Sequence, residues 1–106
     1  MLTWNGDPLV SGFCIRISRS ALARGYCPLP LPALTALAKA NGQDPLNSNN
    51  YYDPESGYDG WELFGTFNGA PFSLYTRYGV LKVGGNDALD VDGLNAALES
   101  ACALNA

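Results

Sequence analysis

The sequence predicts a small α+β domain, a two-layer sandwich in which two helices cover an antiparallel sheet of about four strands. Three observations lead to this fold class: paired turn signals inside one apolar stretch, an alanine-rich segment bounded by proline and glycine, and a helical apolar period near the C-terminus. The 106 residues, of which 47% are hydrophobic and 15% charged, suit a single domain spanning 1–106 with a core of its own.

The strongest strand signal is a meander over 61–83. Its three apolar-rich runs are 61–67, 71–77 and 80–83. Asn68-Gly69 separates the first two runs and is a strong hairpin signal, and Tyr78-Gly79 is a weaker one. The first turn predicts that Leu63 faces Leu74, and the second that Leu74 faces Val83. Both turns therefore give the same partition of side chains between the two faces of the sheet.

The predicted register makes one face of the meander apolar and the other mixed. The apolar face holds Trp61, Leu63, Phe67, Phe72, Leu74, Leu81 and Val83. The mixed face holds Glu62, Phe64, Ser73, Tyr75, Arg77 and Lys82, with Glu62, Tyr75 and Lys82 in one cross-strand row. We expect only the apolar face to be the core. Phe64 and Tyr75 then either form an exposed docking or homodimer surface, or are covered by the 43–60 segment.

The other predicted elements are one strand and two helices. Alternation of Phe13, Ile15 and Ile17 with polar or small residues predicts a strand over 12–18, and the prolines at every second position of 26–32 predict a stiff connector. A helix is predicted over 33–41, after Pro32 and before Gly42. A second helix is predicted over 91–104, with Asp90 as its N-cap and Asp92 in its first turn.

The composition excludes several chemistries. The chain has no histidine, so triads and metal sites that depend on imidazole are absent. Its cysteines are Cys14, Cys27 and Cys102, and no pair of them has the C-x-x-C spacing. We therefore predict a cytoplasmic protein that is not an enzyme and holds neither cofactor nor metal. Cys102 reads as a small core residue, while pairing of Cys14 with Cys27 is left open. Carboxylate catalysis by Asp59 with Glu62 is a minor alternative.

Charge is strongly segregated along the chain. The formal net charge is −4, yet 8–43 holds four basic residues and no acid, whereas 44–76 holds five acids and no base. Direct binding to nucleic acid or to an anionic membrane is disfavoured, because both draw affinity from lysine and arginine. The two segments either pair with each other or leave an acidic face free for a basic partner.

The candidate binding site lies in the polar stretch 43–60, which we expect to be a long loop. Tyrosine supplies large, semi-rigid contact area, and a carboxylate beside it can hold lysine or arginine by ion pairing and cation–π contact. The predicted partner-binding residues are Tyr51, Tyr52, Asp53, Glu55, Tyr58 and Asp59. The alternative is that these rings fold back onto the sheet. Trp61 is expected in the core.

Two weaker patterns lie near the second helix. Asp90, Asp92, Gly93 and Glu99 match part of a calcium loop, but position one would be Ala88, and a capped helix start explains the same residues. Gly84-Gly85 resembles a phosphate loop, although the neighbouring aspartates would repel phosphate. These patterns keep a small-molecule or metal-binding sensor domain as an alternative function, beside a homo-oligomeric structural protein.

The sequence therefore leads to a hypothesis about function rather than to an assignment. It favours a non-catalytic, acidic protein-binding module that docks onto a basic partner protein, such as a nucleic-acid-binding enzyme. By analogy, such a module would suit an inhibitor of the phage-encoded anti-defence kind, in the manner of an anti-CRISPR protein.

Overall fold

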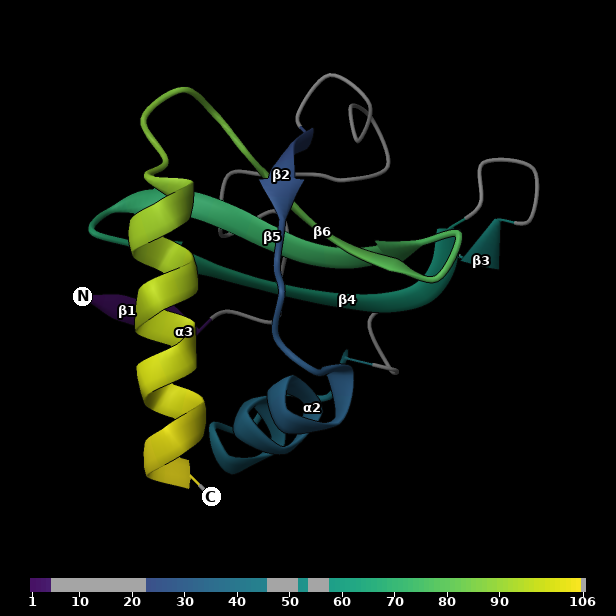
Figure 1. Ribbon diagram of the computed structural model, residues 1–106, viewed down its shortest axis with the longest axis horizontal. Helices are drawn as coiled ribbons and strands as arrows, with labels where there is room; N and C mark the ends of the chain where they lie inside the picture. Colours follow the sequence, from purple (N-terminus) through teal and green to yellow (C-terminus); the bar gives the residue numbers. More distant parts are fainter. Residues whose placement is uncertain (5–22, 46–51, 54–57, 106) are drawn as a thin grey trace.

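The computed structural model describes residues 1–4, 23–45, 52–53 and 58–105, and these form an antiparallel sheet with two helices on one side (Figure 1). The elements, in chain order, are β1 (Leu2–Trp4), β2 (Ala23–Tyr26), α2 (Leu31–Ala40), β3 (Tyr52–Asp53), β4 (Tyr58–Phe67), β5 (Ala70–Arg77), β6 (Val80–Gly85) and α3 (Val91–Asn105). The predicted α+β class is confirmed. None of the described helices is long and apolar enough to cross a membrane.

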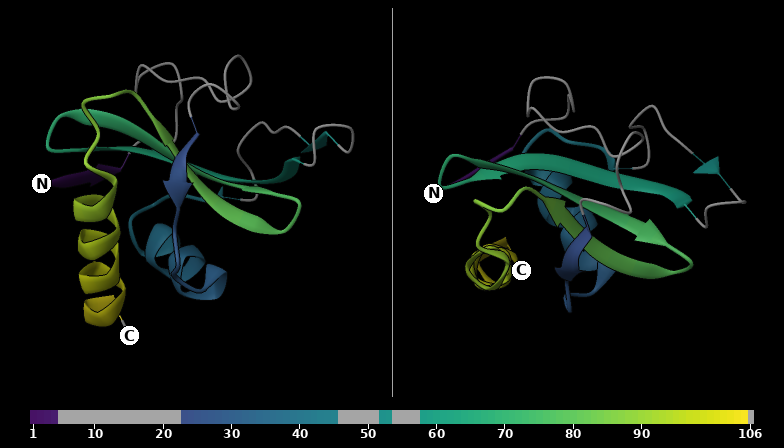
Figure 2. Two further views of the ribbon diagram at one scale, coloured as in Figure 1. Left: turned by 45° about the horizontal axis from the view of Figure 1, so that its top comes forward. Right: turned by 90° about the horizontal axis from the view of Figure 1, so that it is seen from above.

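The sheet is wider than predicted. Within the described residues, five of its six strands follow the order β1-β4-β5-β6-β2, and the sixth, β3, pairs with β4. Since β5 occupies one edge of β4, β1 and β3 share the other edge, β1 near Gly65–Phe67 and β3 near Tyr58–Asp59. They lie at opposite ends of β4 (Figure 1). The two turned views show α2 and α3 on the same side of the sheet (Figure 2).

The meander has the predicted register. Leu63 pairs with Leu74, and Leu74 pairs with Val83. Both connecting turns place two consecutive residues at positive φ, 52° and 84° at Asn68-Gly69 and 52° and 73° at Tyr78-Gly79. This is the conformation of the tight hairpin turns whose twist matches that of the strands. A short local signal therefore fixes which side chains enter the core.

The core lies between the apolar face of the meander and the two helices. Phe72, Leu74 and Val83 are fully buried there, and Trp61 is 3% exposed. The helices contribute Leu34, Leu37, Ala38, Leu94 and Leu98 to the same cluster. The small side chain of Ala38 allows α2 to lie close to its neighbours. These contacts confirm the predicted apolar face and the core role of Trp61.

The expectation that only one face of the meander is buried is wrong. Phe64 is 1% exposed, and Tyr75 and Ser73 are fully buried. Both faces of the meander are thus buried at these positions. The alternation of side chains does not reveal this, because it predicts one apolar and one mixed face. Burial agrees with the alternative in which this face is covered. The homodimer hypothesis loses the exposed Phe64 ring on which it depended.

Both predicted helices are present. α2 begins at Leu31, two residues before the predicted start, with Pro32 in its first turn, and Gly42 follows its end at φ +78°. Residues 91–104 all fall within α3, and the backbone N–H of Gly93 donates to Oδ1 of Asp90 at 3.0 Å. The predicted N-cap is confirmed.

The sequence reading missed the short strands at the margins of the sheet. β1 was not predicted, β2 occupies the residues just before the proline-rich connector, and β3 with the start of β4 interrupts the expected 43–60 loop. All three short strands pair along only one side within the described residues. Such edge strands carry few alternating apolar positions, so their pairing comes from tertiary contacts. The predicted strand 12–18 lies outside the described residues.

Candidate functional site

Four of the six predicted partner-binding residues come together in β3 and β4. Tyr52 faces Asp59, and Asp53 faces Tyr58, in an antiparallel pair of strands. We call these four positions the acidic-aromatic ladder. Cross-strand partners share a face of a sheet, so the register gives each face one tyrosine and one aspartate position. Tyr51 and Glu55 lie outside the described residues.

The ladder stands at the end of β4 that β1 does not reach. There the register of β4 against β5 shifts between Tyr58 and Glu62, so Tyr58 pairs with Arg77. The guanidinium carbon of Arg77 lies 5.8 Å from the centre of the exposed Tyr78 ring. A cationic residue thus borders the acidic positions on the β5 side.

Trp61, two residues after the ladder position Asp59, connects β4 to α2 through a hydrogen bond. Its indole Nε1 donates to Oγ1 of Thr35 at 3.0 Å, and the same hydroxyl donates to the backbone oxygen of Leu31 at 2.9 Å. The next residue, Glu62, is only 2% exposed. Glu62 is therefore withdrawn from solvent.

An apolar groove of about 460 Å³ opens on α2 beside Trp61. It is lined by Leu31, Pro32, Thr35, Ala36, Lys39 and Trp61. Lys39 is exposed and supplies its charged group. Only one residue separates Trp61 from Asp59 in the chain, so this groove adjoins the acidic-aromatic ladder. Sequence reasoning missed it, because it forms only when the end of β4 meets α2.

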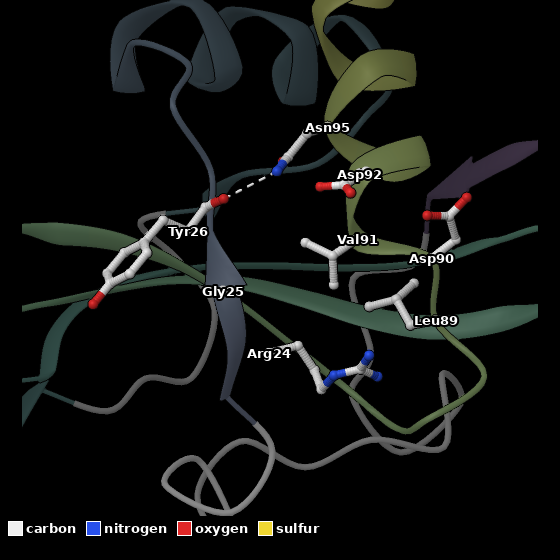
Figure 3. Close-up of a pocket in the computed structure, with 8 residues that line it drawn as sticks. All are labelled: Arg24, Gly25, Tyr26, Leu89, Asp90, Val91, Asp92 and Asn95. Carbon is white, nitrogen blue, oxygen red and sulfur yellow. Dashed lines mark hydrogen bonds between the residues drawn. The ribbon is translucent and has the colours of Figure 1, made fainter.

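A second, polar pocket of about 430 Å³ lies between β2 and the first turns of α3 (Figure 3). We call it the β2–α3 pocket. Its lining residues are Arg24, Gly25, Tyr26, Leu89, Asp90, Val91, Asp92 and Asn95. Nδ2 of Asn95 donates to the backbone oxygen of Tyr26 at 2.9 Å and joins the two walls. The sequence pointed to the 84–93 turn, but it gave no sign that Arg24 and Tyr26 face it.

The two weaker patterns near α3 have structural explanations. Asp90 caps α3 by accepting a hydrogen bond from the backbone N–H of Gly93. Among the described residues, no group of three or more potential ligands is placed to hold a metal ion. Gly84 and Gly85 belong to strand β6 instead of a loop. A Cβ at Gly85 would press against the side chain of Leu89 and the backbone oxygen of Pro71, so close packing explains that glycine.

Cys27 and Cys102 are free thiols. Cys27 is buried in the core, and Cys102 packs against the same cluster while partly exposed. Burial raises the pKa of both thiols above the ordinary value, and the nearby Cys102 raises the pKa of Cys27 further. Thiols in this state are poor nucleophiles at neutral pH.

Comparison with protein-family models, curated proteins and solved structures finds no match to this chain. The proposals below therefore rest on the geometry and chemistry of its own residues.

Proposed function

We propose that the protein is a non-catalytic binding module whose acidic-aromatic ladder docks onto a basic surface of a partner protein. The observation that carries the proposal is the strand register, which sets Tyr52 opposite Asp59 and Asp53 opposite Tyr58. Two residue types suited to bind lysine and arginine thus occupy four neighbouring positions of one strand pair. A solvated linker needs no such arrangement.

The apolar groove beside Trp61 supports the same surface. Protein interfaces combine an apolar centre with a polar rim, and tyrosine and tryptophan are enriched at their energetic centres. Here the groove supplies the apolar part and the ladder supplies the acidic part, while the net charge of −4 favours approach of a cationic partner. Arg77, which borders the ladder, restricts the area on which a cation of the partner can settle.

The partner class that fits this chemistry is a nucleic-acid-binding enzyme, because its binding groove is rich in arginine and lysine. An acidic module seated there would block the groove and act as a cytoplasmic inhibitor, as phage-type anti-defence proteins do. This part of the proposal rests on the charge pattern and on analogy.

The test compares two variants that remove the same charge. Asp53→Asn with Asp59→Asn changes the ladder, while Asp87→Asn with Glu99→Gln changes two exposed acids elsewhere. Each protein is used to capture partners from its host lysate, and the captured proteins are identified. We expect the unchanged protein and the control to retain basic nucleic-acid-binding proteins that the ladder variant loses.

Affinity for the purified partner then decides the mechanism. The ladder variant should bind at least tenfold more weakly. Its binding should also depend much less on salt, because the two carboxylates whose attraction to the partner is screened by salt have been removed. Competing nucleic acid should release the unchanged protein. Equal affinity of the ladder variant and the control at low salt would refute the proposal.

A further inference from the structure

The β2–α3 pocket carries opposite charges on separate walls. Arg24 comes from β2, and Asp92 comes from the first turn of α3 (Figure 3). Both side chains are exposed, and they form no ion pair with each other in the described part of the chain. The Arg24 guanidinium donates through one nitrogen to the backbone oxygen of Asn86, which orients it and leaves further N–H groups to donate.

Asn95 adds an acceptor to the wall that carries Asp92. Its Nδ2 is held by the backbone oxygen of Tyr26, whereas its Oδ1 is buried and accepts no hydrogen bond from the described residues. A buried acceptor without a donor costs free energy. Oδ1 is closed to solvent, so the Asn95 side chain must shift before a donor of a ligand can reach it. An ammonium group supplies such a donor and is also attracted by Asp92.

The edge of β2 adds a donor to the wall that carries Arg24. The backbone N–H of Cys27 donates to Leu81 of β6 at 3.1 Å. Backbone groups alternate along an antiparallel strand, so the N–H and C=O of Tyr26 point away from β6. Asn95 takes the C=O, which confirms this direction. The N–H of Tyr26 is left on the pocket side of β2 and can serve a carboxylate together with Arg24.

The geometry points to a binding site for a small zwitterion, a free α-amino acid, in the β2–α3 pocket. Its ammonium group binds Asp92 and Oδ1 of Asn95, and its carboxylate binds Arg24 and the N–H of Tyr26. The volume of about 430 Å³ leaves room for a side chain beside Val91. The lining holds Asp90 and Asp92 beside Arg24. A simple anion is repelled by the two aspartates, and a simple cation leaves Arg24 without a counter-ion, so a ligand with both charges fits best. The site is separate from the acidic-aromatic ladder.

The test titrates the full chain with free L-amino acids and follows two NMR signals, the side-chain amide of Asn95 and the backbone amide of Tyr26. We expect saturable shifts with at least one amino acid. Its N-acetyl and carboxamide derivatives, which each remove one charge, should bind about ten- to a hundredfold more weakly. This comparison uses the unchanged protein and does not depend on the folding of any variant.

Variants locate the site. Arg24→Gln and Asp92→Asn should each weaken binding by about tenfold or more, while Lys39→Gln and Glu99→Gln, which make the same charge changes elsewhere, leave it unchanged. No saturable shift with any amino acid at millimolar concentration would overturn the inference. So would equal binding of the derivatives, or binding of inorganic phosphate or Ca²⁺ in place of amino acids. Neither variant touches the ladder, so this failure and that of the proposed docking are distinguishable.

Discussion

The ammonium group of Lys82 lies 5.4 Å from the centre of the Tyr26 ring, directly across from β6 to β2. Lys82 also pairs with Tyr75, which pairs with Glu62. The row predicted from the meander alone thus continues one strand further, onto β2. Tyr26 is 63% exposed, so the row runs from the buried interior of the sheet to its surface.

The Tyr26–Lys82 contact should contribute a small, measurable coupling. A double-mutant cycle with Tyr26→Leu and Lys82→Met is expected to give about 0.5–1 kcal/mol, the usual range for exposed cation–π pairs. Urea denaturation of the four proteins measures it. If the two substitutions prove additive, the ring and the ammonium group do not stabilise each other in solution.

Replacing Gly65 with alanine should be severely destabilising for steric reasons. A Cβ there would collide with the backbone oxygen of Thr3 and lie 2.8 Å from Cζ of Phe72, so β1 or the core must move. We expect Gly65→Ala to lower the free energy of unfolding by about 2–3 kcal/mol.

Gly42→Ala is the matched control, because that position is open but has φ +78°. It should cost about 1 kcal/mol through backbone strain alone. Denaturation midpoints of the two variants separate packing from strain, and a Gly65→Ala variant as stable as Gly42→Ala would contradict the close contact with β1.

Loss of the α3 cap should weaken the helix by an amount that serine can restore. Asp90→Ala removes the bond from the Gly93 N–H and is expected to cost about 1 kcal/mol, whereas Asp90→Ser should keep most of the stability. Asp87→Ala, at an exposed position outside the helix, should stay within about 0.5 kcal/mol of the unchanged protein. Thermal unfolding of all three tests this, and an equal loss for Asp87→Ala and Asp90→Ala would point to net charge instead.

The buried thiols should make the fold less stable in alkali. Burial raises the pKa of Cys27 and Cys102 in the folded state above the ordinary value of 9.0, so unfolding at higher pH releases protons. Stability is then unaffected well below pH 9.0 and falls as the pH rises through it. Tyrosine and lysine titrate in the same pH range, so the comparison is with the Cys27→Ala, Cys102→Ala double variant, whose stability should decline less steeply with pH.

The two thiols should also differ in reactivity. In a Cys14→Ser background, an alkylating reagent should modify the partly exposed Cys102 before Cys27. The reverse order would contradict their burial.

The parts of the fold that sequence predicts well are those that local chemistry determines. Asn68-Gly69 and Tyr78-Gly79 set two turns, the turns set the register, and the register chooses the core face. Asp90 likewise defines the start of α3. The short strands β1, β2 and β3 follow from pairing with distant segments, and no local pattern in the chain announces them.

The candidate sites divide in the same way. Tyrosines among acids drew attention to 52–59 because composition alone is unusual there. That Tyr52 lies opposite Asp59 could be known only from the register of β3 against β4. The β2–α3 pocket could not be predicted from the sequence, since Arg24 and Asn95 line one pocket only when β2 pairs with β6 and α3 packs beside it. Similarly, the burial of Phe64 and Tyr75 depends on tertiary contacts, which the alternation of side chains along a strand does not predict.

β1 and β3 pair with opposite ends of one edge of β4, so the proposed binding positions lie apart from the strand that packs on the core. Residues 65–67 pair with β1, while residues 58–59, at the other end of β4, pair with β3 and form half of the ladder. If the ladder docks onto a partner as proposed, a combinatorial library confined to its four positions would sample new specificities without changing the residues that form the core.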